Sequence, residues 1–359
     1  MLTENRITEL LEFLNREQRK LNVVLLPDFF QDRLVSLNAD EPHFEELVRN
    51  VVKRKGGSVD GISQTDLNGG NAINTASALA SLGATVTPIV CTDDFGLYQM
   101  KYRLKKYHVD FSHVKIVDKP SKTTALEFRS KNETINVMLR DVGGLSDFGP
   151  SNLTESDYSI IEDSDYACLF NWAGTKNYGT LLAQTVFRRA RKGKGRTYFD
   201  TADPTPNIEE APELMKRVLK TNQVDILSLN ENEAISYAGL LSEKLGAKSE
   251  NRSVEEHALQ CARDIAKTLQ SRIDLHTTAF SATITKQNEV VIPSFPIRPL
   301  RATGAGDAWN AGNIIADGNS LSEENRLVFA NAVSACYLSD PQGRHPDKQR
   351  LIKFLKAAN

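Results

Sequence analysis

The chain has 359 residues, a formal net charge of −2, and hydrophobic and charged fractions of 40% and 25%. This composition is typical of a folded domain, and the near-neutral charge gives no reason to expect a nucleic-acid or membrane partner. The four cysteines lie far apart, which predicts neither a disulfide framework nor a zinc site and fits a reducing cytoplasm. The N-terminus lacks a signal-peptide core, and no apolar run approaches the roughly 20 residues of a membrane span.

The first part of the chain predicts a helix followed by a buried strand. Residues 3–20 carry apolar side chains at helical spacing, so we expect an N-terminal helix packed on the outside of the main domain. Residues 21–26 are an apolar run that predicts the first strand. The segment after it contains two carboxylates, Asp28 and Asp32, and an ordinary surface loop is one interpretation of either residue.

A pair of glycines opens the next predicted helix. Gly69 and Gly70 precede a run of Ala, Ser and Leu that ends at Gly83. Glycine permits close approach to a ligand, and the amide of Asn74 both donates and accepts hydrogen bonds. The stretch therefore predicts a binding site, with a tightly packed helix entry as the alternative.

The segment between residues 85 and 141 changes from α/β to β character. A strand over 85–90 is followed by Asp94-Phe95-Gly96, which we interpret as a structural turn before a helix over 97–107. Three β-prone segments then alternate with turn-forming residues, which predicts an antiparallel meander. These segments are 113–117, 123–128 and 134–139.

From Ser156 onward, strands and helices alternate with short connections, which predicts a parallel sheet. Ligands bind at the carboxyl ends of such strands, so position alone makes candidates of the polar residues there. They are Asn171, Asp200, Asn230 and Glu233. Asn230 and Glu233 offer oxygen atoms suited to magnesium and its bound waters, although the same spacing also predicts a helix capping box.

The most informative stretch lies at 303–307, where a glycine-containing loop joins a strand at 290–295 to a helix of small residues over 308–316. The free N–H groups of a helix N-terminus and the helix dipole form an anion site suited to phosphate. Asp307 would repel a phosphate, unless it removes a proton from a hydroxyl that attacks it. The alternative is an ordinary helix start with an early aspartate.

Three motifs together resemble the ribokinase-like (pfkB) family of carbohydrate kinases. Thr303-Gly304-Ala305-Gly306-Asp307 is similar to its C-terminal signature, and Gly69-Gly70 with Asn74 is similar to its N-terminal signature. The third motif is Asn230-x-x-Glu233. The resemblance implies a three-layer α/β/α fold with a central, mostly parallel sheet and a small β-sheet lid. It places a helical extension at 1–20 and the kinase domain at 21–359, with lid strands expected within 33–66 and 109–140.

The resemblance also implies an enzyme, a phosphotransferase that uses ATP and Mg²⁺ to phosphorylate a hydroxyl of a small sugar, sugar acid, polyol or nucleoside. Asp307 would be the general base, and the 303–306 loop would be the anion hole through Gly304, Ala305 and Gly306. The implied acceptor-binding residues are Asp32, Gly69, Gly70, Asn74 and Asn171. The implied nucleotide-binding residues are Asn230, Thr278, Thr303, Gly304, Gly306 and Asn331. Asn230 and Glu233 would organise magnesium through water.

Two departures from the family pattern keep alternatives open. Pro27 stands where the family often has glycine, so the choice between Asp28 and Asp32 stays open. Phe280 stands where a glycine near the nucleotide is usual. ADP as the donor and a non-catalytic sensor on the same fold are the alternative functions. A monovalent cation is a further candidate cofactor, and the family gives a reason to expect a homodimer through the lid.

Overall fold

A computed structural model describes residues 4–130, 133–242, 252–301 and 303–358. At its centre lies an eight-stranded sheet in which six neighbouring strands are parallel. The last two strands along the chain extend one edge of this sheet through antiparallel pairing. In sheet order the strands are β14 (Glu289–Pro293), β13 (Phe280–Ile284), β12 (Arg272–His276), β11 (Ile226–Leu229), β10 (Arg196–Asp200), β9 (Tyr166–Phe170), β1 (Asn22–Leu26) and β4 (Thr85–Pro88). The predicted mostly parallel central sheet is confirmed.

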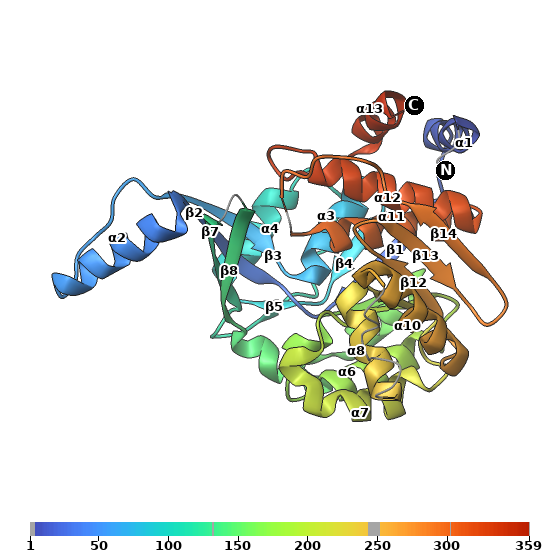
Figure 1. Ribbon diagram of the computed structural model, residues 1–359. Coiled ribbons are helices and arrows are strands. Elements are labelled where there is room, and N and C mark those ends of the chain that lie inside the picture. The colour runs from blue at the N-terminus through green and yellow to red at the C-terminus, as the bar shows by residue number, and fades with distance from the viewer. Residues whose placement is uncertain (1–3, 131–132, 243–251, 302, 359) are drawn as a thin grey trace.

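Helices cover both faces of this sheet, which gives the predicted three layers (Figure 1). One layer contains α1 (Glu4–Asn15), α3 (Asn71–Ser81), α11 (Ala305–Gly318), α12 (Glu323–Leu338) and α13 (Lys348–Ala357). The other contains α5 (Glu155–Asp163), α6 (Gly179–Ala190), α7 (Ala211–Leu214), α8 (Glu231–Leu241) and α10 (Val254–Thr268). Each layer packs on its face of the sheet through a separate hydrophobic cluster, because the strands are apolar on both sides.

The first layer is closely packed because its helices are built from small residues. A Cβ on Gly312 of α11 would lie 2.8 Å from Cα of Ala330 in α12, so the two backbones approach more closely than a larger residue permits. The N-terminal helix α1 joins the same cluster, where the ring of Phe13 meets that of Phe329 edge-on at 5.5 Å. None of the described helices is long and apolar enough to cross a bilayer.

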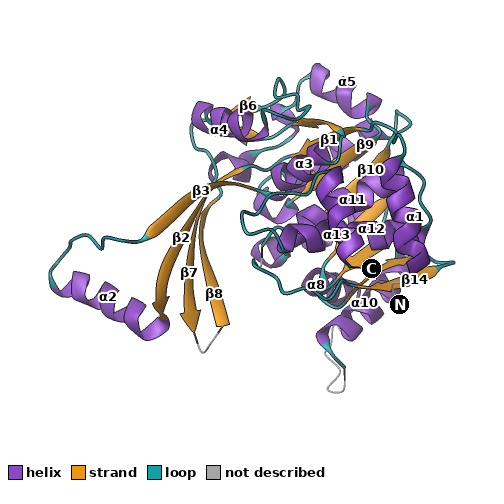
Figure 2. Cartoon of the chain, turned by 90° about the horizontal axis from the view of Figure 1, so that it is seen from above, coloured by secondary structure: helices purple, strands orange, loops and turns teal. Residues whose placement is uncertain are grey.

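A separate four-stranded sheet, in the order β3-β2-β7-β8, stands beside the main body (Figure 2). We call it the lid; its strands are β2 (Phe30–Asp40), β3 (Ser63–Gly69), β7 (Lys122–Ser130) and β8 (Glu133–Asp141). Between β2 and β3 the chain forms a helix, α2 (Glu41–Lys53), that projects from the lid and stacks Phe44 on Phe128 at 5.4 Å. The sequence analysis did not predict α2, although its apolar residues have helical spacing.

The predicted three-stranded meander is wrong in its first segment. Residues 115 and 116 form β6 (Lys115–Ile116), which pairs in parallel with β5 (Cys91–Thr92) outside the lid. His113 and Lys115 bond the buried carboxylate of Asp157 at 2.7 and 2.6 Å, and this anchors the segment to the body. Strand β2 takes its place in the lid and runs parallel to β7.

One further local prediction needs correction. Asp94-Phe95-Gly96 is the first turn of helix α4 (Asp94–Leu104) rather than a separate turn, because Asp93 caps the helix by accepting from the Gly96 N–H at 2.8 Å. Residues 277–279 form a tight turn between β12 and β13.

Candidate active site

The glycine loop lies where the sequence predicted it, between β14 and the N-terminus of α11. Gly304 caps the helix in the left-handed region, with φ of +82°, and no side chain of the described residues bonds to the first-turn N–H groups. Because a Cβ is strained in this conformation, glycine is the residue that lets the chain enter the helix here. The first-turn N–H groups are therefore free to bind an anion.

Asp307 lies in the first turn of α11 and is held by two amides from α3. Asn71 Nδ2 donates to one carboxylate oxygen and Asn74 Nδ2 to the other, each at 3.0 Å. Burial raises the pKa of Asp307 well above its ordinary value, and the negative charges of Asp200 and Asp28 raise it further. A raised pKa and fixed orientation suit a carboxylate that accepts a proton near neutral pH.

Asp28 and Asp32, which the sequence left as rivals, have different surroundings. Asp28 is fully buried and accepts from the N–H groups of Asn71 and Ala72, at 2.9 and 2.8 Å, so it caps helix α3. It also accepts from Asn171 Nδ2 at 2.9 Å. Since its oxygens already receive three hydrogen bonds, its contacts are those of a structural residue.

Asp32 lies on lid strand β2, and one of its carboxylate oxygens is buried without a hydrogen-bond partner among the described residues. Burial raises the pKa of Asp32 to about 6, although hydrogen bonding to Thr123 and the charge of Arg140 oppose the increase. The lack of a side chain at Gly69 makes space for this carboxylate, because a Cβ at that position would overlap with it. An unpaired buried oxygen is costly, so Asp32 is positioned to accept a hydrogen bond from a ligand.

The other residues predicted at the acceptor side have contacts within the protein. Gly70 has φ of +93°, and a Cβ on it would lie 2.9 Å from the Asp28 carbonyl oxygen, which explains the second glycine. Asn171 ends β9 in the left-handed conformation, with its amide bonded to Asp28. Asn74 directs its amide N–H to Asp307.

Asn230 and Glu233 form the capping box that the sequence offered as one of two interpretations. Glu233 N donates to Asn230 Oδ1 at 3.0 Å, and the Asn230 N–H donates to Glu233 Oε2 at 2.9 Å. Burial raises the pKa of Glu233 well above its ordinary value, and the charge of Asp200 adds to this. A carboxylate in this position is stabilised in its charged form by a nearby cation.

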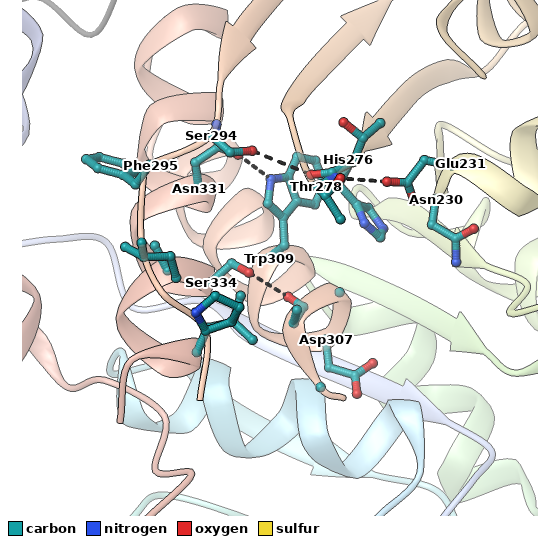
Figure 3. A pocket seen from close by; sticks show the side chains of 18 of the residues that line it. Asn230, Glu231, His276, Thr278, Ser294, Phe295, Asp307, Trp309, Asn331 and Ser334 are labelled. Atoms are coloured by element: carbon teal, nitrogen blue, oxygen red, sulfur yellow. Dashed lines mark hydrogen bonds between the residues drawn. The ribbon is translucent and has the colours of Figure 1, made fainter. Parts of the chain in front are cut away.

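A cavity of about 570 Å³ connects Asn230 and Glu233 with Asp307 and the glycine loop (Figure 3). Four carboxylates line it, and its described lining contains no lysine or arginine. The carboxylates are those of Asp200, Glu231, Glu233 and Asp307. Burial raises the pKa of Asp200 to about 6, although an amide from Asn310 at 2.6 Å opposes the increase. A polyphosphate would meet four carboxylates and no positive side chain among the described lining residues, so it needs an accompanying cation.

The predicted nucleotide residues lie partly in this cavity. Thr278 and Asn331 line it together with Gly304 and Gly306. The Thr278 N–H donates to Glu231 at 2.8 Å, and Asn331 Oδ1 accepts from the Trp309 indole at 2.9 Å. Thr303 is exposed on the loop and does not belong to the described lining.

Sequence reasoning did not single out Asn71, His276 or Trp309, all of which line the cavity together with the predicted candidate Asp200. Two of them could have been found: Asn71 lies one helical turn before Asn74, and His276 ends a strand, as Asp200 does. His276 packs against Trp309 in a tilted arrangement with ring centres 5.0 Å apart, and burial lowers its pKa to about 4. The imidazole is therefore neutral near pH 7.

A three-layer α/β fold with a small lid, an open helix N-terminus and an adjacent buried aspartate defines the ribokinase-like class of phosphotransferases. The model of a family described as pfkB family carbohydrate kinase matches residues 44–350. The chain belongs to this family, and it is a kinase that phosphorylates an alcohol group.

Individual relatives agree with this assignment. The chain is 23% identical over 334 residues to a ribokinase of Haemophilus influenzae, covering 90% of this chain and 98% of the relative. A ribokinase of Bacillus subtilis is 39% identical over 70 residues, which is 19% of this chain and 24% of that one. Among solved structures, Arabidopsis thaliana ribokinase complexed with ribose and ATP superposes with a TM-score of 0.72 at 17% identity, covering 94% of this chain and 99% of that one.

Proposed function

We propose that this kinase transfers the γ-phosphoryl group of ATP, bound with Mg²⁺, to a hydroxyl of a small sugar, sugar acid, polyol or nucleoside. The observation that carries the proposal is the position of Asp307, a buried carboxylate held by two amides at an uncapped helix N-terminus. Beside a phosphate, such a carboxylate serves a reaction that needs a proton acceptor.

In the proposed reaction, the acceptor hydroxyl gives its proton to Asp307 as its oxygen forms a bond to the γ-phosphorus. The bond between that phosphorus and the bridging oxygen breaks, and the electron pair leaves with the ADP. The N–H groups of the 303–306 loop donate hydrogen bonds to the oxygens of the transferred group, on which negative charge develops. Asn71 and Asn74 keep the carboxylate pointed at the hydroxyl.

The carboxylates of the cavity fit a magnesium ion. Glu233 and Asp200 are buried, their pKa values are raised, and the described lining offers no positive side chain to neutralise them. We expect Asn230 and Glu233 to hold Mg²⁺ through water, because Mg²⁺ prefers oxygen ligands and keeps several waters. The bound ion would neutralise phosphate charge. A solved structure of a putative ribokinase II from E. coli, with a TM-score of 0.70, is described as a complex with ATP and Mg²⁺.

The acceptor would bind between Asp307 and the lid, with the unpartnered oxygen of Asp32 accepting from one of its hydroxyls. Ribose is the first acceptor to test, because two curated relatives are named ribokinase. A nucleoside is the second, because a nucleoside kinase of Methanocaldococcus jannaschii has a TM-score of 0.64 with this chain.

A screen of phosphoryl transfer tests the proposal. Purified protein is mixed with ribose, other sugars, sugar acids, inositol or nucleosides, and with ATP or ADP, with and without Mg²⁺. We expect transfer from ATP to at least one acceptor, dependent on Mg²⁺. Transfer from ADP alone would favour the alternative donor. Thermal stabilisation by a sugar without any transfer would favour a non-catalytic sensor, because binding to the native state alone raises stability.

The lid gives a further proposal, a homodimer through its exposed apolar side chains. Val137 and Leu139 on strand β8 are exposed, which is unusual for neighbouring large apolar residues. We expect light scattering to give twice the chain mass, and Leu139→Glu to return it to that of one chain. A wild-type protein with the mass of one chain contradicts this.

A further inference from the structure

Helix α12 meets the anion loop along one face. Asn331, Ser334 and Tyr337 follow one another at intervals of three residues, so they lie on the same side of the helix. All three contact the first turn of α11 or the loop before it: Asn331 bonds Trp309, Ser334 bonds Ala305, and the Tyr337 hydroxyl lies beside Gly304. Figure 3 shows the first two contacts.

Ser334 fixes the orientation of one peptide group in this turn. Its hydroxyl donates to the Ala305 carbonyl oxygen at 3.0 Å. A trans peptide is planar, and its C=O and N–H point in opposite directions. Holding the Ala305 carbonyl toward α12 therefore directs the Gly306 N–H away from α12. Gly306 lines the cavity, as Ser334 itself does.

Tyr337 supports the loop at its other glycine. A Cβ on Gly304 would lie 2.5 Å from the Tyr337 hydroxyl, so the phenol directly borders the left-handed residue that starts the helix. The ring is held by two neighbours. His345 stacks on it with centres 4.7 Å apart and planes 15° apart, and the Arg301 guanidinium lies 5.4 Å from its centre. A ring held in this way has little freedom to let the loop shift.

We propose that Ser334 and Tyr337 are positioning residues that hold the 303–306 loop in the conformation that receives charge on the transferred phosphoryl group. Neither needs to touch the substrate, because both act through the backbone of the loop. The proposal rests on the function proposed above. It predicts that their loss slows the transfer step more than it weakens binding of either substrate.

Steady-state kinetics of three serine variants test the role of Ser334. Ser334→Ala removes the hydrogen bond to Ala305, and we expect kcat to fall about 3–10-fold with an unchanged acceptor KM. Ser334→Thr keeps a hydroxyl on the same carbon and should restore at least half of the lost kcat. Ser339→Ala is the matched control: it removes the hydroxyl of the serine at the C-cap of the same helix, which donates to the Ala335 carbonyl oxygen at 2.9 Å and not to the loop. Its kcat should stay within twofold of wild type.

Tyr337 is tested in the same assay. Tyr337→Phe keeps the stacked ring and removes only the hydroxyl, so we expect a fall in kcat of about 2–5-fold. Tyr337→Leu also removes the ring that stacks on His345, and it should lower kcat about tenfold or more. Because both residues act on one loop, the effects of Ser334→Ala and Tyr337→Phe should not multiply in the double variant.

Wild-type kcat in both Ser334→Ala and Tyr337→Leu overturns the proposal. So does a fall in kcat that Ser334→Thr fails to restore, or one that Ser339→Ala reproduces. Asp307→Asn, measured alongside, separates this proposal from the assigned function. Neutral α12 variants beside an inactive Asp307→Asn reject the positioning role alone, whereas an active Asp307→Asn rejects the function on which it rests.

Discussion

The catalytic centre and the lid differ in how many of their polar groups already have partners. At the centre, Asp307 receives two amide hydrogen bonds, Asp28 receives three, and Asn230 and Glu233 cap each other. In the lid, by contrast, a buried oxygen of Asp32 has no partner among the described residues, and apolar side chains of β8 are exposed.

This difference indicates a division of work. Groups fixed before the substrate arrives reduce the reorganisation needed in the transition state, so changes to them should appear mainly in kcat. Groups that lack a partner until the acceptor binds should influence its affinity and its choice. The variants below test that division, beginning with the largest expected effect.

Asp307→Asn should reduce kcat about 10²–10⁴-fold, the usual contribution of a general base, with little change in either KM. An amide cannot accept the hydroxyl proton at neutral pH. It also places an NH₂ opposite one of the two amide donors, Asn71 or Asn74. Initial rates measured on the acceptor from the screen give both constants. A variant within tenfold of wild-type kcat would show that Asp307 merely begins the helix.

Glu233→Gln should raise the Mg²⁺ concentration for half-maximal rate about 10–100-fold, which is typical when a group that organises a metal is replaced. The acceptor KM should not change. The chain provides a matched control in another capping box, where Ser253 and Glu256 cap α10 at an exposed position. Glu256→Gln alters the same kind of cap, and it should leave the Mg²⁺ dependence as it is.

Asp32→Asn should raise the acceptor KM at least about tenfold, because a hydrogen bond to a charged group is lost, and should change kcat less. Asp66→Asn is its control, a lid carboxylate that forms an exposed ion pair with Arg33 at 2.7 Å. Exposed pairs contribute little, so this variant should behave as wild type. Equal acceptor KM values in the two variants would place the acceptor away from Asp32.

The smallest effect concerns stability and pH. The raised pKa values of Asp200, Glu233 and Asp307 mean that the folded protein binds protons more tightly than the unfolded chain. The loss of folding stability from ionising these buried groups is absent at pH values below the unfolded-state pKa of about 4. It is fully present at pH values above the folded-state pKa, which is about 6 for Asp200. Millimolar Mg²⁺ should therefore raise Tm more at about pH 8 than at about pH 5. A Mg²⁺ response that is equal at both pH values contradicts the prediction.

The sequence predicted the parts of the molecule whose signals are local. The glycine loop before α11, the strand ends of the parallel sheet and the helix of small residues after Gly70 all follow from short-range patterns. Because they follow parallel strands, four polar residues were also expected at the same edge of the sheet: Asn171, Asp200, Asn230 and Glu233. These features depend on backbone conformation and periodicity, which neighbouring residues determine.

Such local patterns could not predict which segments far apart in the sequence contact each other. That Asp28 caps α3, or that Asn74 reaches Asp307, depends on how segments far apart in sequence meet. The departure of 113–117 from the lid has the same origin, because it depends on pairing with β5 and on the ion pair between Lys115 and Asp157. The insertion of α2 was missed for another reason: its apolar stripe is short and lies between polar stretches.

The packing of α1 has a consequence for how the chain is made. Phe13, near the start, meets Phe329, near the end, and α11 lies between α12 and the α3 helix that carries Asn74. On the ribosome, α1 and α3 therefore emerge long before the helices that cover them. A nascent chain that stops before residue 303 has neither the anion loop nor Asp307, and it leaves apolar residues of α1 and α3 exposed to chaperones and proteases. Under the proposed function, activity therefore requires that residues 303–307 have been synthesised.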